Sequence, residues 1–111
     1  MKKRHFKHFP LAGFTYYEGP EVFTELKIGT LLRLEFEPNN KFDPYAIAIY
    51  YNEFKLGFVP KTENHSLSKF VELGHDIFET RIQRISPEEQ PENQIQVIIY
   101  LLPAAKETPK E

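Results

Sequence analysis

Apolar and polar residues alternate with a period of two along most of this chain, which places successive side chains on opposite faces of a strand. The clearest case is residues 31–37, where Leu32, Leu34 and Phe36 would face a core and the charged residues between them would face water. Five other short segments show this pattern or are compatible with it. The sequence therefore predicts a mainly β protein, with strands at residues 11–17, 31–37, 46–51, 54–59, 75–85 and 94–102.

The apolar residues between positions 62 and 73 have instead the three-to-four spacing of an amphipathic helix. Thr62 or Asn64 could cap the start of this helix, and Gly74 suits the position that follows its end. Strands as short as those predicted cannot bury a core as a flat sheet, so we expect a small antiparallel barrel or a strongly curled sheet with the helix at one opening. The apolar face of the helix would consist of Leu67, Phe70, Val71 and Leu73.

The chain has 111 residues and no cysteine, which indicates one domain held together by its core and fits a reducing compartment. No apolar stretch approaches the roughly 20 residues that a membrane-spanning helix needs. The N-terminal residues are basic but are not followed by the apolar run and cleavage site of a signal peptide. We expect a cytoplasmic protein with no membrane association.

The formal net charge of −2 hides an uneven distribution. Four basic residues precede position 10, and Glu18 is the only acidic residue among the first 20, so the rest of the chain is acidic. We expect residues 1–9 to form a basic N-terminal arm, residues 10–102 the folded domain, and residues 103–111 a flexible tail. The basic residues of the arm are Lys2, Lys3, Arg4 and Lys7.

Enzymatic motifs are absent from the sequence: it has no phosphate-binding glycine loop, no Gly-x-Ser-x-Gly elbow and no His-Glu-x-x-His helix. His5 and His8 are three residues apart, and His65 and His75 lie near the two ends of the predicted helix. Histidine pairs without a clustered carboxylate or cysteine make a poor metal site. We therefore expect a non-catalytic protein without a metal or another cofactor.

Two clusters of aromatic residues remain without an assigned place in the core. Phe42 and Tyr45 lie in a loop whose asparagines, aspartate and prolines favour tight turns, with Asp43 between them. Tyr16 lies in an aromatic segment near the basic N-terminus, and Lys61 precedes the predicted helix. These residues could be an ordinary loop and solvated side chains. They could equally form a surface on which nucleic-acid bases stack, with a lysine for phosphate.

These segments resemble the HIRAN domain family. The resemblance rests on residues 12–19 (AGFTYYEG), 37–47 (EPNNKFDPYAI) and 56–60 (LGFVP), which occur in the family's order, and it extends over about residues 10–102. It implies a small six-stranded, OB-like antiparallel barrel with one or two helices. In members that are fused to fork-remodelling ATPases, the domain binds single-stranded DNA and captures its free 3′-hydroxyl end. This chain looks like the standalone form, which could act with an ATPase or nuclease partner.

The resemblance also implies roles for individual residues. Tyr16 corresponds to a tyrosine that stacks on the terminal bases, and Phe42 falls where DNA-binding members have a second tyrosine. Asp43 matches an aspartate that accepts a hydrogen bond from the 3′-hydroxyl. Asn40 matches a polar residue of the same pocket, and Lys61 matches a lysine that contacts phosphate.

Two positions depart from this pattern. Thr15 stands where those members have an arginine, and Phe58 where they have a histidine. A threonine cannot replace the charge-assisted phosphate contacts of an arginine. We expect the basic N-terminal arm to restore that charge if it folds beside the pocket.

Two hypotheses follow from these observations. The first is a DNA-binding module that recognises single-stranded DNA at its 3′ end in DNA repair or replication-fork processing. The second is a protein- or peptide-interaction module, in which the same small barrel offers an edge strand or an aromatic groove to a peptide.

Overall fold

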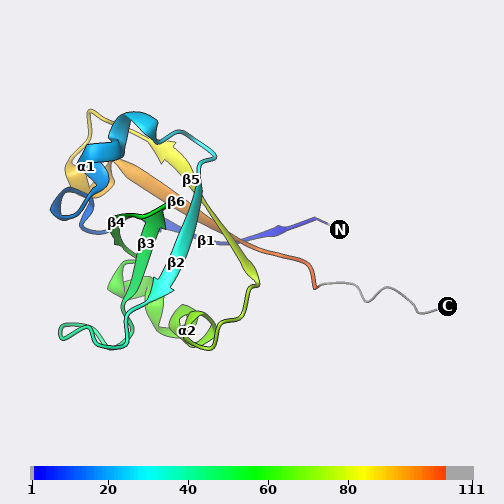
Figure 1. Cartoon of the computed structure of the whole chain (residues 1–111). Coiled ribbons are helices and arrows are strands. Elements are labelled where there is room, and N and C mark those ends of the chain that lie inside the picture. The colour runs from blue at the N-terminus through cyan, green and yellow to red at the C-terminus, as the bar shows by residue number, and fades with distance from the viewer. Residues whose placement is uncertain (1, 105–111) are drawn as a thin grey trace.

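The computed structural model describes residues 2–104, and its strands form one six-stranded antiparallel sheet (Figure 1). The strand order across the sheet is β1-β6-β5-β2-β3-β4. The mainly β class and the six antiparallel strands are therefore as the sequence predicts. The strands are β1 (Arg4–Pro10), β2 (Leu31–Phe36), β3 (Ile47–Tyr51), β4 (Phe54–Phe58), β5 (Phe78–Ile85) and β6 (Ile95–Leu101).

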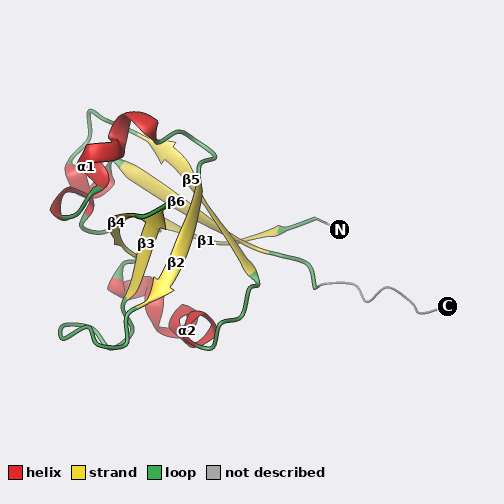
Figure 2. Ribbon diagram, viewed as in Figure 1, coloured by secondary structure: helices red, strands yellow, loops and turns green. Residues whose placement is uncertain are grey.

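Two α-helices accompany the sheet (Figure 2). The short helix α1 (Gly19–Val22) follows β1, and the longer helix α2 (Lys61–Glu72) follows β4. In Figure 1, α2 lies below β2 and β3 and faces the diverging end of β5. Three 3₁₀ helices complete the fold: η1 (Phe14–Tyr16), η2 (Phe23–Glu25) and η3 (Pro91–Asn93).

The sheet curls strongly but does not close into a continuous barrel. Its two outer strands, β1 and β4, do not pair as strands. The chain just beyond β1 forms a single antiparallel bridge with the end of β4, between Ala12 and Phe58, with both N–H···O distances at 2.9 Å. The fold is therefore an OB-like sheet joined across its open side at one point.

The first strand is the main correction to the sequence-based expectation. Residues 11–17 do not form a strand, because Gly13 adopts a left-handed φ of 76° and turns the chain into η1. The first strand is β1, which pairs with β6 and includes most of the segment expected to be a free basic arm. Only Phe9 of β1 is fully buried, so the alternation that marks the other strands is weak there.

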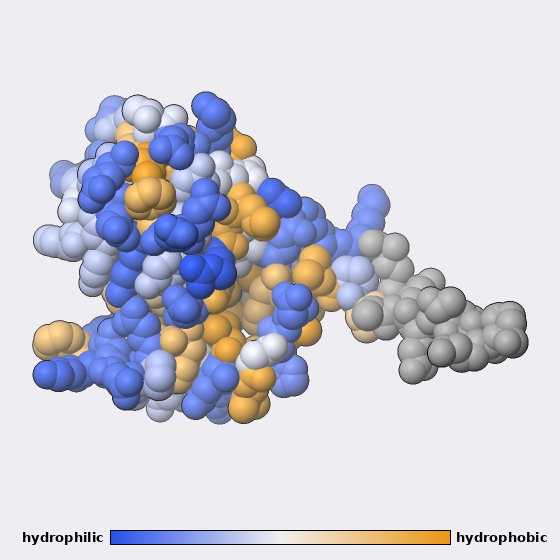
Figure 3. Space-filling view, in the orientation of Figure 1, coloured by the Kyte–Doolittle hydropathy of each residue, from blue (hydrophilic) through white to orange (hydrophobic). Residues whose placement is uncertain are grey.

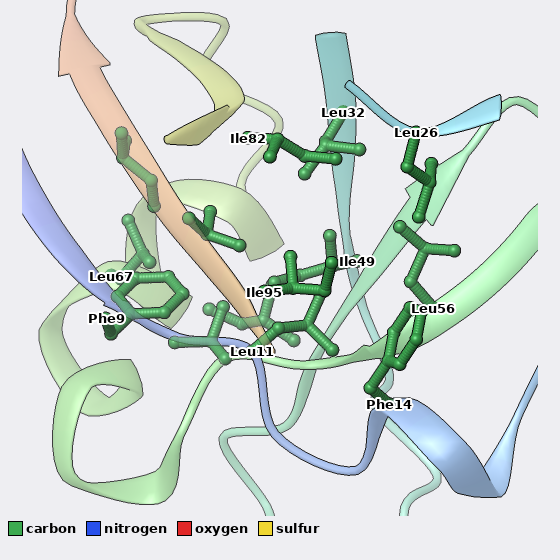
Figure 4. Close-up of a cluster of buried hydrophobic side chains, with 14 of the residues drawn as sticks. Phe9, Leu11, Phe14, Leu26, Leu32, Ile49, Leu56, Leu67, Ile82 and Ile95 are labelled. Atoms are coloured by element: carbon green, nitrogen blue, oxygen red, sulfur yellow. The ribbon is translucent and has the colours of Figure 1, made fainter. Parts of the chain in front are cut away.

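A compact cluster of buried side chains from the strands, from α2 and from the residues around α1 fills the curled sheet (Figure 4). The alternation predicted for β2 is present: Leu32 is buried and Leu34 and Phe36 are half-buried, whereas the charged residues between them are exposed. Helices α1 and α2 contribute Val22 and Leu67 to this cluster, and η1 contributes Phe14. Core side chains that the sheet and α2 contribute include Ile47, Ile49, Leu56, Leu67, Ile82, Ile95, Val97 and Ile99, and Leu11, just after β1, joins them.

Helix α2 occupies the predicted position but buries a narrower face than predicted. Leu67 is fully buried, whereas Phe70 is 42% and Leu73 is 73% exposed. No side chain caps the start of the helix; Asn64 is buried and bonds elsewhere. Gly74, with φ 78°, follows the helix end as predicted.

The helices of residues 2–104 are short, the longest being α2 with 12 residues. None of them is long and apolar enough to cross a bilayer.

Candidate nucleic-acid interface

The loop between β2 and β3 is shaped by its own side chains. The Asn40 carboxamide oxygen accepts hydrogen bonds from the backbone N–H groups of Phe42 (2.9 Å) and Asp43 (3.0 Å), and its NH₂ group donates to Glu37 Oε1 at 3.1 Å. Asp43 Oδ1 accepts from the backbone N–H of Tyr45 at 2.9 Å. These are the local bonds that asparagine and aspartate favour in turns. Asn40 therefore holds the loop in shape, with one N–H of its NH₂ group used in the bond to Glu37.

The 3₁₀ helix η1 projects Tyr16 from the opposite side of the same region. The position of Tyr16 depends on Gly13, which adopts a left-handed φ that would be strained in a residue with a side chain. A Cβ atom added at Gly13 would also lie only 3.2 Å from the Tyr17 ring. Tyr16 is 84% exposed, and Phe42 at the tip of the β2–β3 loop is 85% exposed. Two large aromatic side chains therefore stand in solvent on neighbouring segments.

A cavity of 260 Å³ lies between these two segments, and we call it the Tyr16–Phe42 cavity. The β2–β3 loop projects at the lower left of Figure 3, and a hollow separates it from the surface above. Six of the seven residues proposed from the sequence to form one site line this cavity: Tyr16, Asn40, Phe42, Asp43, Phe58 and Lys61. The remaining lining residues are Ala12, Gly13, Tyr17, Ala46 and Val59.

Asp43 is held in place by a residue that the sequence pattern did not single out for this role. Its Oδ2 accepts a hydrogen bond of 2.9 Å from the side-chain NH₂ of Asn64, which is only 2% exposed. A carboxylate offers about four lone-pair positions, and Asn64 and the Tyr45 N–H use two of them. Asp43, half-buried in the wall of the cavity, can therefore still accept a hydrogen bond from a ligand hydroxyl.

Lys61 begins α2 and lies at the rim of the cavity. Its Nζ donates a hydrogen bond of 3.4 Å to the backbone oxygen of Phe42. Within residues 2–104, no acidic side chain forms an ion pair with it. Its charge is therefore available to a phosphate beside the cavity.

Lys55 is a second cation near the cavity, and sequence reasoning missed it. Its Nζ lies 2.6 Å from Glu37 Oε2, 4.5 Å from the centre of the Phe58 ring and 4.9 Å from that of Tyr17. The Tyr17 and Phe58 rings meet edge to face, with their centres 5.4 Å apart. No local pattern signals this arrangement, because it depends on the pairing of β3 with β4 and on the η1 turn.

The basic N-terminal residues do not line the Tyr16–Phe42 cavity, so the condition under which they would restore the missing charge is not met. Lys3 forms an ion pair with Glu79 at 2.6 Å, and Lys7 forms one with Glu63 at 3.2 Å. Neither Lys2 nor Arg4 lines the Tyr16–Phe42 cavity, and Thr15 also lies outside the lining. The strand pairing of β1 with β6 fixes these residues on another part of the surface.

The four histidines and the carboxylates do not assemble a metal site in the part of the chain that the structure describes. No group of three or more potential ligands occurs there. His5 Nε2 and His8 Nδ1 lie 2.8 Å apart on the exposed strand β1, and His65 stacks on Tyr45 with ring centres 4.3 Å apart.

Comparison with known proteins identifies the family. A sequence model of the HIRAN domain matches residues 7–101. The chain belongs to the HIRAN domain family. No curated protein matches the sequence.

Two solved structures share the HIRAN fold with this chain. A crystal structure of a Lactobacillus plantarum protein matches with a TM-score of 0.74 and 17% identity, over 90% of this chain and 95% of that one. The HIRAN domain of human HLTF matches with a TM-score of 0.62 and 17% identity, over 90% of this chain and 80% of that one. At these identities the likeness extends to the fold and not to individual side chains.

Proposed function

We propose that this HIRAN domain is a non-catalytic DNA-binding module that recognises single-stranded DNA at its free 3′-hydroxyl end, in DNA repair or replication-fork processing. The supporting observation is the Tyr16–Phe42 cavity, in which two highly exposed aromatic rings flank a carboxylate that retains hydrogen-bonding capacity. Exposed aromatic rings with nearby cations are the usual components of single-strand binding sites.

Each group has a separate part in this proposal. Tyr16 and Phe42 stack on the bases nearest the 3′ end, and Asp43 accepts a hydrogen bond from the terminal hydroxyl. Lys61 contacts a phosphate. Phe58 adds an apolar wall below the bases, and Lys55, whose charge is compensated by Glu37, packs over its ring.

Asn40 and Asn64 act through Asp43 rather than on the DNA. The Asn40 side-chain oxygen accepts hydrogen bonds from two backbone N–H groups of the loop, and the buried Asn64 donates a hydrogen bond to the Asp43 carboxylate. Together they fix the carboxylate before a ligand arrives, which reduces the ordering cost of binding. Thr15 has no contact role in the proposal, because it lies outside the cavity.

A fluorescence titration with labelled oligonucleotides tests the proposal. Single strands ending in a 3′-hydroxyl should bind roughly tenfold or more tightly than the same strands ending in a 3′-phosphate, because the phosphate would place negative charge against Asp43. Blunt duplex should bind weakly. The variant Asp43→Asn should narrow the difference between the two ends, since the repelling charge is gone. If the native protein bound both kinds of end with equal affinity, the end-recognition part of the proposal would be wrong. If it bound no single-stranded DNA, the whole proposal would be wrong.

A further inference from the structure

A second hollow opens on a different part of the surface, between β2, β5 and the C-terminal end of α2, and we call it the β2–β5 groove. Its volume is 440 Å³, within the range of roughly 300–1,000 Å³ typical of ligand sites. Hydrophobic surface gathers through the middle of this face in Figure 3. No residue lines both hollows. The apolar lining of the groove consists of Leu31, Leu32, Leu34, Val71, Phe78 and Leu102.

Unpaired strand backbone borders the groove. The β2–β5 ladder ends at the Leu32–Thr80 pair, beyond which the two strands diverge. In an antiparallel sheet, the backbone N–H and C=O groups of successive residues point to opposite neighbouring strands. The backbone groups of Arg33 and Glu35 point to β3, so those of Leu34 point to the β5 side, where the ladder has stopped.

The facing strand repeats this arrangement. Ile77 accepts a hydrogen bond of 2.8 Å from the Leu102 N–H on the β6 side of β5. The backbone groups of the next residue, Phe78, therefore point to the opposite side, towards the groove. Free backbone groups on both walls are what an extended polypeptide needs in order to pair as an added strand.

The charge of the groove distinguishes between partners. Asp76 lines it, is exposed, and forms no ion pair within residues 2–104. Glu79 also lines it but is paired with Lys3 and Arg81, and the cation Arg33 is paired with Glu35. The uncompensated charge is thus negative. It disfavours nucleic-acid phosphates and favours a basic side chain.

We propose that the β2–β5 groove binds an extended segment of a partner protein, one that is apolar towards the groove and carries a lysine or arginine beside Asp76. The bound segment pairs with the free backbone of Leu34 or Phe78, and its apolar side chains cover Leu31 and Val71. The Tyr16–Phe42 cavity stays open. Because the two sites share no residue, one chain can hold a partner protein and a DNA end at the same time, and the groove functions whether or not the cavity binds DNA.

Selection of peptides from a random library displayed on phage, with the full-length chain as bait, tests this proposal. Enriched peptides should combine alternating apolar residues with a basic residue, and labelled synthetic copies should bind in fluorescence anisotropy. The variant Leu31→Asp should weaken binding by roughly fivefold or more. The matched control Ile28→Asp should leave it unchanged, because Ile28 is also highly exposed, at 70% against 56% for Leu31, and lies outside the groove. The variant Asp76→Lys should redirect selection from basic to acidic peptides.

Several results would overturn the proposal. One is the absence of any enriched peptide, and another is binding that survives Leu31→Asp but is lost in Tyr16→Ala. Displacement of the peptide by single-stranded oligonucleotide would assign the groove to DNA, and dimerisation abolished by Leu31→Asp, measured by light scattering, would assign it to a second copy of this chain. Peptide binding that persists in the presence of saturating oligonucleotide supports the proposal, and a chain that binds peptide but no oligonucleotide contradicts only the proposed function.

Discussion

Replacement of Tyr16 by alanine separates an effect on binding from an effect on folding. Tyr16 is 84% exposed, so its removal leaves no cavity in the core, and we expect the free energy of unfolding to change by less than about 0.5 kcal/mol. Stacking of one base on an aromatic ring contributes roughly 1–3 kcal/mol. At about 1.4 kcal/mol for each factor of ten, the variant should bind a single-stranded oligonucleotide about 5- to 150-fold more weakly.

Fluorescence anisotropy with a short 3′-hydroxyl oligonucleotide measures the affinity, and thermal unfolding measured by circular dichroism checks the fold. The variant Leu73→Ala is the control, since it also removes a large side chain that is highly exposed, at 73%, and lies outside the Tyr16–Phe42 cavity. It should leave the affinity unchanged. If Tyr16→Ala binds as tightly as the native chain while its melting temperature is the same, the stacking role of Tyr16 is wrong.

Three further predictions concern the framework around the site. Asn64→Ala should lower the free energy of unfolding, measured in urea, by roughly 1.5–3 kcal/mol, the usual value of a hydrogen bond to a charged group. It should also weaken the preference for 3′-hydroxyl ends. If stability and end preference were both unchanged, Asp43 would need no partner. Gly57→Ala should lower the free energy of unfolding by about 1–3 kcal/mol or more, because the new Cβ would lie 2.2 Å from the Ala12 backbone oxygen. Gly29 has open space around it, so Gly29→Ala should lower the melting temperature less than Gly57→Ala does. Hydrogen bonds from Arg81 and, to a smaller extent, Lys3 lower the pKa of Glu79 below its ordinary 4.5. The contribution of Glu79 to stability is therefore complete above pH 4.5 and is lost as the pH falls through the lower pKa of the folded state. In acid unfolding, the stability of Glu79→Gln should fall less steeply with pH than that of the native chain, and identical curves would contradict the assignment.

The elements that the sequence predicts well are those whose signal is local. The β3–β4 hairpin follows from two apolar segments around Asn52, which adopts the positive φ of 53° that a tight turn needs. The end of α2 follows from Gly74, and the inward face of β2 from its strict alternation. In each case the residue's own conformational preference or a repeat within a few positions is sufficient.

The elements that the sequence misses depend on distant neighbours. Strand β1 is an edge strand in which Lys7 pairs with Glu63, and Lys3, just before the strand, pairs with Glu79. Both partners lie far along the chain, so the composition of this segment resembles that of an arm. Its pairing with β6 decides that it is a strand, and that pairing moves the basic residues away from the cavity. The supporting positions of Asn64 and Lys55 likewise result from contacts across the fold.

The sequence by itself determined the β class, most of the strands, the position of α2 and the residue types of the candidate site, because these depend on periodicity, turn chemistry and a family motif. The tertiary structure alone decided that Tyr16 and Phe42 line one cavity, that Asp43 is held by Asn64, and that β2 and β5 diverge to leave a groove with unpaired backbone. The physical reason is that side-chain proximity and strand pairing are set by the curl of the whole sheet, which no short segment of the chain specifies.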